Sequence, residues 1–250
     1  MRSTRSVVAV VPARAGSKGI PGKNLRAVAG RSLVRRAVES ALAAVTIDAV
    51  VVSTDGDAIA AEARDAGARA VRRPADLAGD EASSESALLH VLDELTAAGE
   101  EPEVVVFLQA TSPFIDPADL DAAVARVRDG HADTVFAAAP SHAFLWRIGD
   151  DGAARAVNHD AAVRPRRQDR EPEYRETGAF YVFRTDAFRQ YRHRFHGRVE
   201  LALVDARGAI DIDDASDLAL ASALAPRLEQ PTPDQRPAAA PHVPALNGAP

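Results

Sequence analysis

The stretch from Pro12 to Asn24 constrains the fold of this chain more than any other, because it is both glycine-rich and basic. It follows an apolar run from Val7 to Val11, which is typical of a parallel strand buried on both faces. A helical pattern begins after it, near Ser32. Strand, glycine-rich basic loop and helix in this order turn backbone N–H groups towards a phosphate. The sequence therefore predicts an α/β domain that binds a nucleotide or another polyphosphate at this loop.

The spacing within the loop excludes two familiar phosphate motifs. Gly16 and Gly22 enclose five residues, where the P-loop has four, and Asn24 stands where that motif needs a hydroxyl. The glycines recur every three residues, which does not match the dinucleotide-binding pattern. Arg14 and Lys23 add positive charge suited to phosphate. The alternative interpretation is a surface loop with solvated lysines.

The remaining composition excludes several classes of function. A net charge of −6 gives no general attraction to nucleic acid or to an anionic membrane. The absence of cysteine excludes disulfides, thiolate metal sites and cysteine nucleophiles, and His193 and His196 do not suggest zinc without it. No apolar stretch approaches the roughly 20 residues that span a bilayer. We expect a cytoplasmic protein that binds neither nucleic acid nor membrane.

Strand and helix patterns alternate along the first half of the chain, which indicates a right-handed, mostly parallel, doubly wound sheet. Ligands bind such sheets at the carboxyl ends of the strands. We therefore expect an active site where four segments converge, namely 12–24, 53–55, 73–84 and 109–113. Later strands are predicted at 179–183 and 200–204, with a short helix at 185–191 between them.

The predicted domain covers residues 1–225. One region within it and the tail that follows it differ in composition from the rest of the chain. Residues 140–176 are polar and arginine-rich, and are interpreted as a simple excursion, a dimerisation arm or a lid. Residues 226–250 are rich in proline and alanine without an apolar period, which predicts a disordered tail.

An acidic pair follows near the end of the domain, in the segment from Ala209 to Asp214. Its alternation places Asp211 and Asp213 on the same face of an extended segment. Neighbouring carboxylates repel unless a cation neutralises them, and magnesium accepts one or two carboxylates together with phosphate oxygens and water. The alternative is that Asp211 faces solvent while Asp213 or Asp214 only caps the following helix.

Six blocks of sequence, in order between Val7 and Ala223, resemble the CMP-N-acylneuraminate synthetases, also called acylneuraminate cytidylyltransferases. The blocks are VVAVVPARAGSKGIPGKNL, VVSTDGDAIAAEARDA, RPADLAGDEASS, LQATSP, RRQDREPEYRETGAFY and IDIDDASD. The resemblance implies a Rossmann-like α/β nucleotidyltransferase domain, whose mixed, mostly parallel sheet is flanked by helices. It also implies a homodimer in which the 140–176 excursion packs against the partner subunit. The reaction that it implies is the magnesium-dependent coupling of CTP to a sialic-acid-like sugar, which yields CMP-sugar and pyrophosphate.

The resemblance also implies roles for individual residues. The nucleotide-binding positions are Ala13, Arg14, Gly16, Ser17, Lys23, Asn24, Arg73 and Ser84. The catalytic positions are Lys23, which would counter charge at the α-phosphate, Arg14, and Asp211, which would receive the attacking proton. Asp211 and Asp213 would be the magnesium ligands. The acceptor positions are Gln109, Arg167 and Tyr181, and the Arg167 guanidinium suits a sugar carboxylate.

The chain departs from the family pattern only on the acceptor side. Ala110 replaces a common proline, Phe114-Ile115 replaces a common Leu-Arg pair, and Thr177 stands at a usual asparagine position. The alternatives are therefore a CTP-dependent transferase with another acceptor, either an octulosonate-type sugar or a non-sugar acid, and a nucleotide-binding protein without catalysis.

Overall fold

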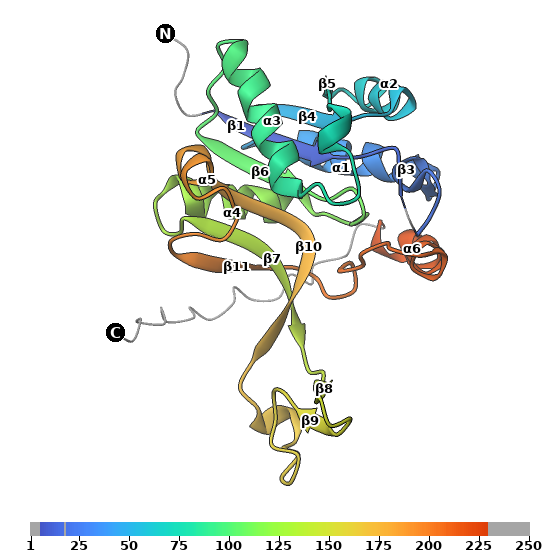
Figure 1. Ribbon diagram of the computed structural model, residues 1–250, viewed down its shortest axis with the longest axis vertical. Helices are drawn as coiled ribbons and strands as arrows, with labels where there is room; N and C mark the ends of the chain where they lie inside the picture. Colours follow the sequence, from blue (N-terminus) through green and yellow to red (C-terminus); the bar gives the residue numbers. More distant parts are fainter. Residues whose placement is uncertain (1–5, 18, 230–250) are drawn as a thin grey trace.

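In the computed structural model, which describes residues 6–17 and 19–229, a mixed seven-stranded sheet forms the centre of the body (Figure 1). Its strands, in spatial order, are β11 (Val199–Leu203), β7 (Thr134–Ser141), β10 (Glu173–Arg184), β6 (Val104–Leu108), β1 (Val7–Pro12), β4 (Ala49–Thr54) and β5 (Arg69–Arg72). β1 pairs in parallel with β4 and β6, whereas β10 is antiparallel to both β6 and β7. The predicted α/β fold is confirmed, and β10 is the strand that makes the sheet mixed.

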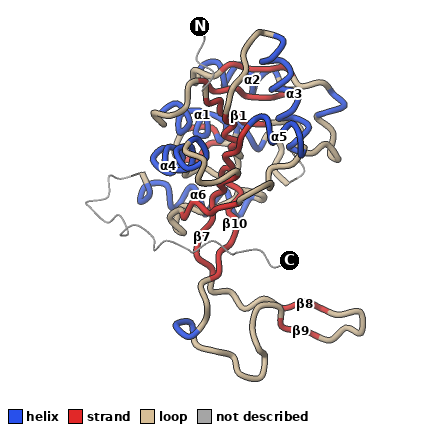
Figure 2. Tube along the Cα trace, turned by 90° about the vertical axis from the view of Figure 1, so that its left-hand side faces the viewer, coloured by secondary structure: helices blue, strands red, loops and turns tan. Residues whose placement is uncertain are grey.

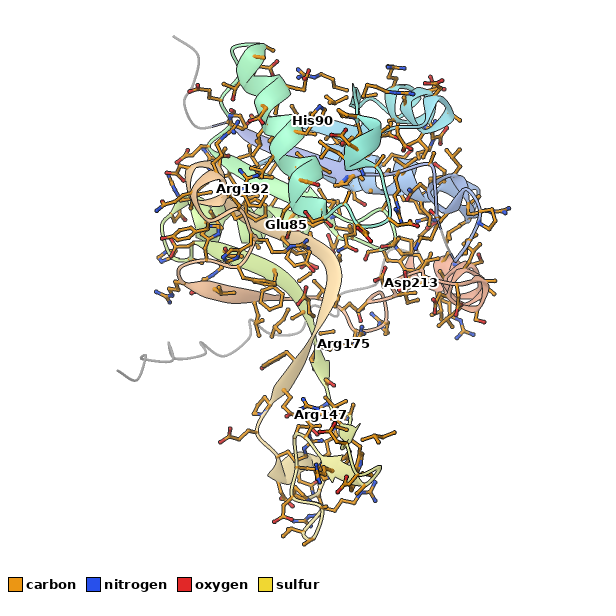
Figure 3. The ribbon with its side chains drawn as sticks, in the orientation of Figure 1. Glu85, His90, Arg147, Arg175, Arg192 and Asp213 are labelled. Atoms are coloured by element: carbon orange, nitrogen blue, oxygen red, sulfur yellow. The ribbon has the colours of Figure 1, made fainter. Side chains whose placement is uncertain are left out.

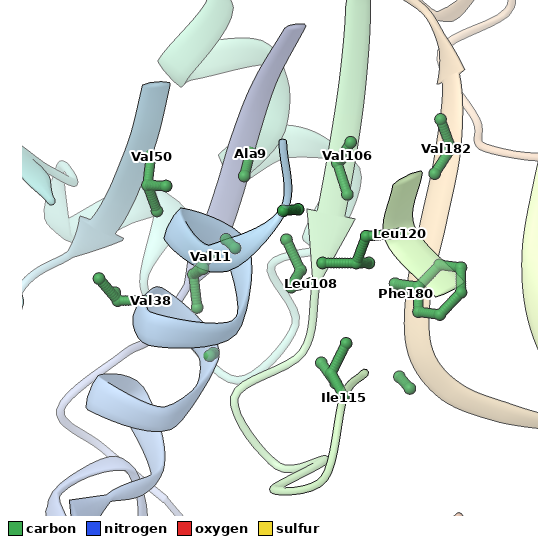
Figure 4. Close-up of a cluster of buried hydrophobic side chains, with 14 of the residues drawn as sticks. Ala9, Val11, Val38, Val50, Val106, Leu108, Ile115, Leu120, Phe180 and Val182 are labelled. Carbon is green, nitrogen blue, oxygen red and sulfur yellow. The ribbon is translucent and has the colours of Figure 1, made fainter. Parts of the chain in front are cut away.

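Helices cover both faces of this sheet. α1 (Leu33–Ala43), α2 (Asp57–Asp65) and α4 (Pro117–Arg128) pack on one face, and α3 (Ser84–Ala97) and α5 (Thr185–Tyr191) on the other. Ala9 and Val11 of β1 enter the first cluster, which Figure 4 shows, while Val8 and Val10 enter the second. This alternation between two buried faces explains why the strand is apolar throughout. Within the described residues, no helix is long and apolar enough to cross a membrane.

A third cluster attaches the last helix, α6 (Ala215–Leu228), to the segment after the glycine-rich loop. That segment contains the turn η1 (Lys23–Leu25) and the small hairpin of β2 (Ala27–Val28) and β3 (Arg31–Ser32). α6 contains Pro226, so it continues past residue 225, where the tail was expected to begin. Residues 230–250 of the expected tail lie outside the described residues.

The 140–176 excursion forms an arm that projects away from the sheet (Figures 1 and 2). Its stem is the extended end of β7 paired with the start of β10, where Glu173 faces Ser141. β10 therefore begins earlier than the strand predicted at 179–183. The arm carries the hairpin of β8 (Trp146–Ile148) and β9 (Ala154–Ala156), and the turn η3 (Arg167–Asp169).

Candidate active site

The glycine-rich loop is held against the end of β4 by its first residues. The backbone N–H of Ala13 donates to the Ser53 carbonyl at 2.9 Å, and that of Ala15 donates to the Asp55 carboxylate at 2.8 Å. The loop also folds back on itself, because the buried Asn24 amide donates to the Arg14 carbonyl at 2.9 Å. The expected convergence of segments 12–24 and 53–55 is therefore confirmed. The hydrogen bond to Arg14 also gives Asn24 a structural contact within the loop.

The far end of the loop meets the segment that carries the acidic pair. A Cβ atom on Gly19 would collide with the backbone carbonyl oxygen of Asp213, so only glycine fits there. Gly22, at φ +64°, starts the turn that presents Lys23. The Lys23 ammonium lies 3.1 Å from the Asp213 carboxylate, with 15% of the lysine side chain exposed against 77% for the aspartate. The structure thus brings a cation of the loop directly to the acidic pair.

Two guanidinium groups lie on the other side of the loop. Arg14 donates to the Asp80 carboxylate at 2.9 Å, which brings the 73–84 segment to the site as expected. Arg73 is buried and donates to the Ser53 hydroxyl at 3.1 Å and to the Ser53 carbonyl at 2.6 Å. Burial lowers the pKa of Arg73, and the positive charge of Arg14 lowers it further, whereas Asp55 opposes the shift. This local positive charge persists within an acidic protein and suits an anion.

The acidic pair is positioned by the apolar residue between its members. Ile212 is fully buried in the third cluster, and its N–H donates to the Thr111 carbonyl at 2.9 Å. Because side chains alternate along an extended backbone, Asp211 and Asp213 both point away from that core. The burial of these residues alternates in the same way, although the segment belongs to no strand: Ile212 is buried, Asp211 is half-buried and Asp213 is exposed. Thr111 lies in the 109–113 segment, which completes the convergence expected from the sequence.

The helix cap is a different residue from the acidic pair. Asp214 accepts hydrogen bonds from the N–H groups of Ser216 and Asp217, at 2.7 and 3.0 Å. The Asp217 carboxylate returns to the N–H groups of Asp213 and Asp214, which completes a capping box. Capping therefore uses Asp214, one of the two residues that the alternative interpretation named, and does not use the carboxylates of Asp211 and Asp213. The same interpretation placed Asp211 in solvent, whereas the Oδ1 atom of Asp211 is buried.

Replacing Ile212 with alanine is expected to destabilise the protein by about 2–4 kcal/mol, because the side chain is fully buried and its loss leaves a cavity. Urea unfolding measures the change. Leu220→Ala is the control, because Leu220 lies on the adjoining helix α6 with 52% of its surface exposed. Equal losses of stability in the two variants would contradict the anchoring role of Ile212.

Asp211 carries the electrostatic features of a cation ligand. Burial raises its pKa, and the neighbouring Asp213 raises it further, whereas Thr111 and Lys23 oppose the rise. Its Oδ1 atom is buried and has no hydrogen-bond partner among the described residues. No group of three or more metal-binding side chains occurs in the described part of the chain. Two carboxylates fit magnesium, whose remaining ligands are then phosphate oxygens and water.

The acceptor residues expected from the resemblance are only partly brought together. The position that a Cβ atom would occupy on Gly178 lies 3.6 Å from Gln109 Oε1 and 3.7 Å from Asp211 Oδ2, so these two side chains converge. Tyr181 is buried in the second core cluster, and its hydroxyl donates to Glu176. Arg167 lies on the arm in η3, exposed and away from the body (Figure 2). Within one chain the structure does not bring Arg167 to the other acceptor residues.

Sequence reasoning missed several side chains that shape this edge of the sheet. Arg175, at the base of the arm (Figure 3), donates to the Ala209 carbonyl at 3.1 Å and braces the segment before Asp211. Asp80 pairs with Arg14 from a stretch that has no periodic pattern. Asp55 and Asp80 lie in the segments 53–55 and 73–84, which were expected at the site without a role for either residue, and Arg175 belongs to the arginine-rich excursion.

The sheet order and the arrangement at its carboxyl edge define an α/β nucleotidyltransferase fold. A solved structure described as CMP:2-keto-3-deoxy-manno-octonic acid synthetase complexed with CTP superposes with a TM-score of 0.67, at 19% sequence identity, over 89% of this chain and 99% of that one. The family model described as Cytidylyltransferase matches residues 8–213. The chain therefore belongs to the cytidylyltransferase family.

Curated relatives refine this assignment and include proteins of the family that the sequence blocks resemble. The N-acylneuraminate cytidylyltransferase of Oncorhynchus mykiss is 35% identical over 182 residues, which are 72% of this chain and 41% of the relative. The N-acylneuraminate cytidylyltransferase of Escherichia coli is 31% identical over 221 residues, which are 86% of this chain and 51% of the relative. The chain thus spans about half the length of these relatives or less.

Proposed function

We propose that this chain is a magnesium-dependent cytidylyltransferase that couples CTP to a sialic-acid-like 2-keto sugar acid, with release of pyrophosphate. The observation that carries the proposal is the contact of Lys23 with Asp213 at 3.1 Å, beside the half-buried carboxylate of Asp211. Lys23, the proposed phosphate ligand, thus lies directly beside Asp211 and Asp213, the proposed metal ligands. The family membership and the two N-acylneuraminate cytidylyltransferase relatives support it.

On the nucleotide side, the triphosphate of CTP displaces the carboxylates that form ion pairs with Arg14 and Lys23 in this structure. Arg14 leaves Asp80 and Lys23 leaves Asp213 when phosphate oxygens take their places. Backbone N–H groups of the loop at Gly16 and Ser17 add uncharged donors to the nucleotide, next to the cations. The backbone from Ala13 to Ser17 meets the cytidine part, and Arg73 and Ser84, at the start of helix α3, contribute to recognition of the nucleotide.

The chemistry requires positioning and charge stabilisation rather than a covalent enzyme intermediate. The anomeric hydroxyl oxygen of the acceptor attacks the α-phosphorus, its bond to phosphorus forms, and the bond to the pyrophosphate oxygen breaks. Lys23 stabilises the negative charge at the α-phosphate, and Asp211 accepts the hydroxyl proton. Asp211 and Asp213 would hold magnesium, which would supply positive charge at the phosphates.

On the acceptor side, we propose that Gln109 binds the sugar beside Asp211, with the hydroxyl edge of Tyr181 and its partner Glu176 nearby. Arg167 binds the carboxylate of the sugar that occupies the site of a partner subunit, because the arm holds Arg167 away from the site of the same chain. Apolar side chains on the arm support a homodimer: Ile148 is 76% exposed, and four others are similarly open, Leu145, Trp146, Val157 and Val163. A chain without cysteine that consumes CTP suits the cytoplasm.

Mixing two inactive variants tests whether Arg167 acts across the dimer. Lys23→Ala and Arg167→Ala are each expected to have little activity, but mixed dimers contain one site with both residues intact. A twofold dimer with random exchange predicts recovery of about a quarter of the wild-type activity. Pyrophosphate release after unfolding and refolding the mixture together measures it. Arg167→Ala mixed with itself is the control, and no recovery in the first mixture would contradict the shared site.

The function itself is tested with purified protein, CTP, magnesium and a panel of acids. We expect pyrophosphate release with a nonulosonic acid, and Lys23→Ala serves as the inactive control. The mass of the nucleotide product distinguishes this from an octulosonate-type sugar or a non-sugar acid. Tight binding of CTP in calorimetry without turnover on any acid would instead favour a non-catalytic nucleotide-binding protein.

A further inference from the structure

Arg194, in the loop after α5, lies at a junction of four elements outside the residues assigned so far. Its guanidinium pairs with Glu85 in the first turn of α3, at 2.8 Å, and only 14% of its side chain is exposed. The same guanidinium lies over the rings of Phe107 and Tyr181, at 4.7 and 4.5 Å from their centroids. Its backbone carbonyl accepts a hydrogen bond from the Thr134 hydroxyl of β7 at 2.9 Å. The residue is therefore fixed at both its backbone and its side chain.

The contacts form a continuous polar and aromatic network on this face of the sheet. The Tyr181 and Phe107 rings stack at 5.3 Å, below the Arg194 guanidinium. The Tyr181 hydroxyl donates to Glu176. Burial and Glu176 raise the pKa of Tyr181 above its ordinary value, and Arg194 opposes the rise. The hydroxyl stays protonated at neutral pH and keeps its orientation towards Glu176.

Each end of this network adjoins one half of the proposed site. Glu85 follows Ser84, the expected nucleotide contact. Phe107 is two residues before Gln109, and Tyr181 is three residues after Gly178, where Gln109 and Asp211 converge. A displacement of the rings would therefore move the strand ends that carry the acceptor side.

We propose that Arg194 is a positioning residue that ties the acceptor side of the site, through Tyr181 and Phe107, to the nucleotide-side helix α3, through Glu85. This inference rests on the proposed transferase function. A guanidinium suits the role because its plane stacks on aromatic rings while its edge donates to a carboxylate. Lysine provides the charge for Glu85 without the planar surface, so it should restore only part of the effect.

The test compares Arg194→Met with Arg189→Met. Arg189 on α5 also forms an ion pair with α3, through Asp93 at 2.6 Å, but has no aromatic partner among the contacts of the described residues. We expect Arg194→Met to raise the KM for the acceptor by about tenfold to a hundredfold, because small displacements of positioned groups are costly. The Kd for CTP, measured by calorimetry without acceptor, should stay within about twofold. Arg194→Lys should fall between Arg194→Met and the wild type.

The possible outcomes separate the inference from the function on which it rests. Wild-type protein that releases no pyrophosphate with any acceptor overturns the proposed function and this inference with it. An active wild type together with an unchanged acceptor KM in Arg194→Met overturns the inference alone. An equal rise in Arg189→Met, or a parallel loss of CTP affinity in Arg194→Met, assigns the effect to general destabilisation and overturns it as well. A selective rise in the acceptor KM, partly rescued by lysine, supports the inference.

Discussion

Replacing Lys23 with alanine is expected to lower kcat by about a hundredfold to a thousandfold, the cost typical of losing one preorganised group that stabilises a developing negative charge. Lys23 is the loop cation that the structure places at the acidic pair, 3.1 Å from Asp213. The same substitution should destabilise the protein by about 0.5–3 kcal/mol, because only 15% of the lysine side chain is exposed and its stem loses packing, whereas the ion pair with the exposed Asp213 itself contributes little. Pyrophosphate release and urea unfolding measure the two effects.

Arg26→Ala is the matched control for Lys23→Ala. Arg26 is an exposed cation in the same stretch, and its Nε donates to the Pro21 carbonyl at 3.2 Å, away from the acidic pair. We expect near-normal turnover in this variant. Turnover in Lys23→Ala that matches Arg26→Ala would remove Lys23 from the mechanism, whatever the stability of the two proteins.

Replacing Asp211 with asparagine is expected to reduce turnover strongly and to weaken the magnesium dependence, while making the fold more stable at neutral pH. Burial raises the pKa of Asp211 above the value of about 3.9 in an unfolded chain, so the folded state holds this proton more tightly. As the pH rises from the unfolded pKa to the folded pKa of Asp211, ionisation of this carboxyl lowers the free energy of unfolding, and the loss is complete above the folded pKa. Asparagine removes this penalty.

The Tm of Asp211→Asn should therefore exceed that of the wild type at pH 7, with the difference shrinking as the pH falls towards 4. Thermal unfolding without magnesium, repeated across this pH range, measures the difference. Asp214→Ala is the control: loss of the cap should lower stability by about 1 kcal/mol with no change in the magnesium titration. An Asp211→Asn protein with lower stability and unchanged magnesium dependence would indicate a structural carboxylate instead of a metal ligand.

Local sequence patterns were sufficient for much of the body. β1 could be predicted because Val7 to Val11 are buried on both faces, and α4 because Asp116 caps it and Pro117 begins it. The glycine-rich loop contacts segments 53–55 and 73–84, and the 109–113 segment joins the same edge through the hydrogen bond of Ile212 to Thr111, since parallel strands place their carboxyl ends at one edge. The antiparallel direction of β10 and its early start at Glu173 depend on pairing with β6 and β7, which no local pattern encodes.

The individual site residues divide in the same way. The resemblance pointed to Arg167 and Tyr181 as acceptor residues, but the structure places one on the arm and buries the ring of the other in the core. The packing of α6 on the third cluster shows that Asp214 caps this helix and that Ile212 anchors the segment before it. Arg194 had no sequence signal, because its partners Glu85, Phe107 and Tyr181 come from three separate elements.

The α/β class, the glycine-rich basic loop from Pro12 to Asn24 and the pair of Asp211 and Asp213 could all be predicted from the order of residues along the chain. These features depend on residue types at fixed short spacings, and periodicity and turn chemistry report such spacings directly. The fold was needed to show that Lys23 meets Asp213 and that Arg194 contacts Glu85, Phe107 and Tyr181. Those are contacts between residues far apart in the chain, and their geometry follows from strand pairing and core packing, not from local spacing.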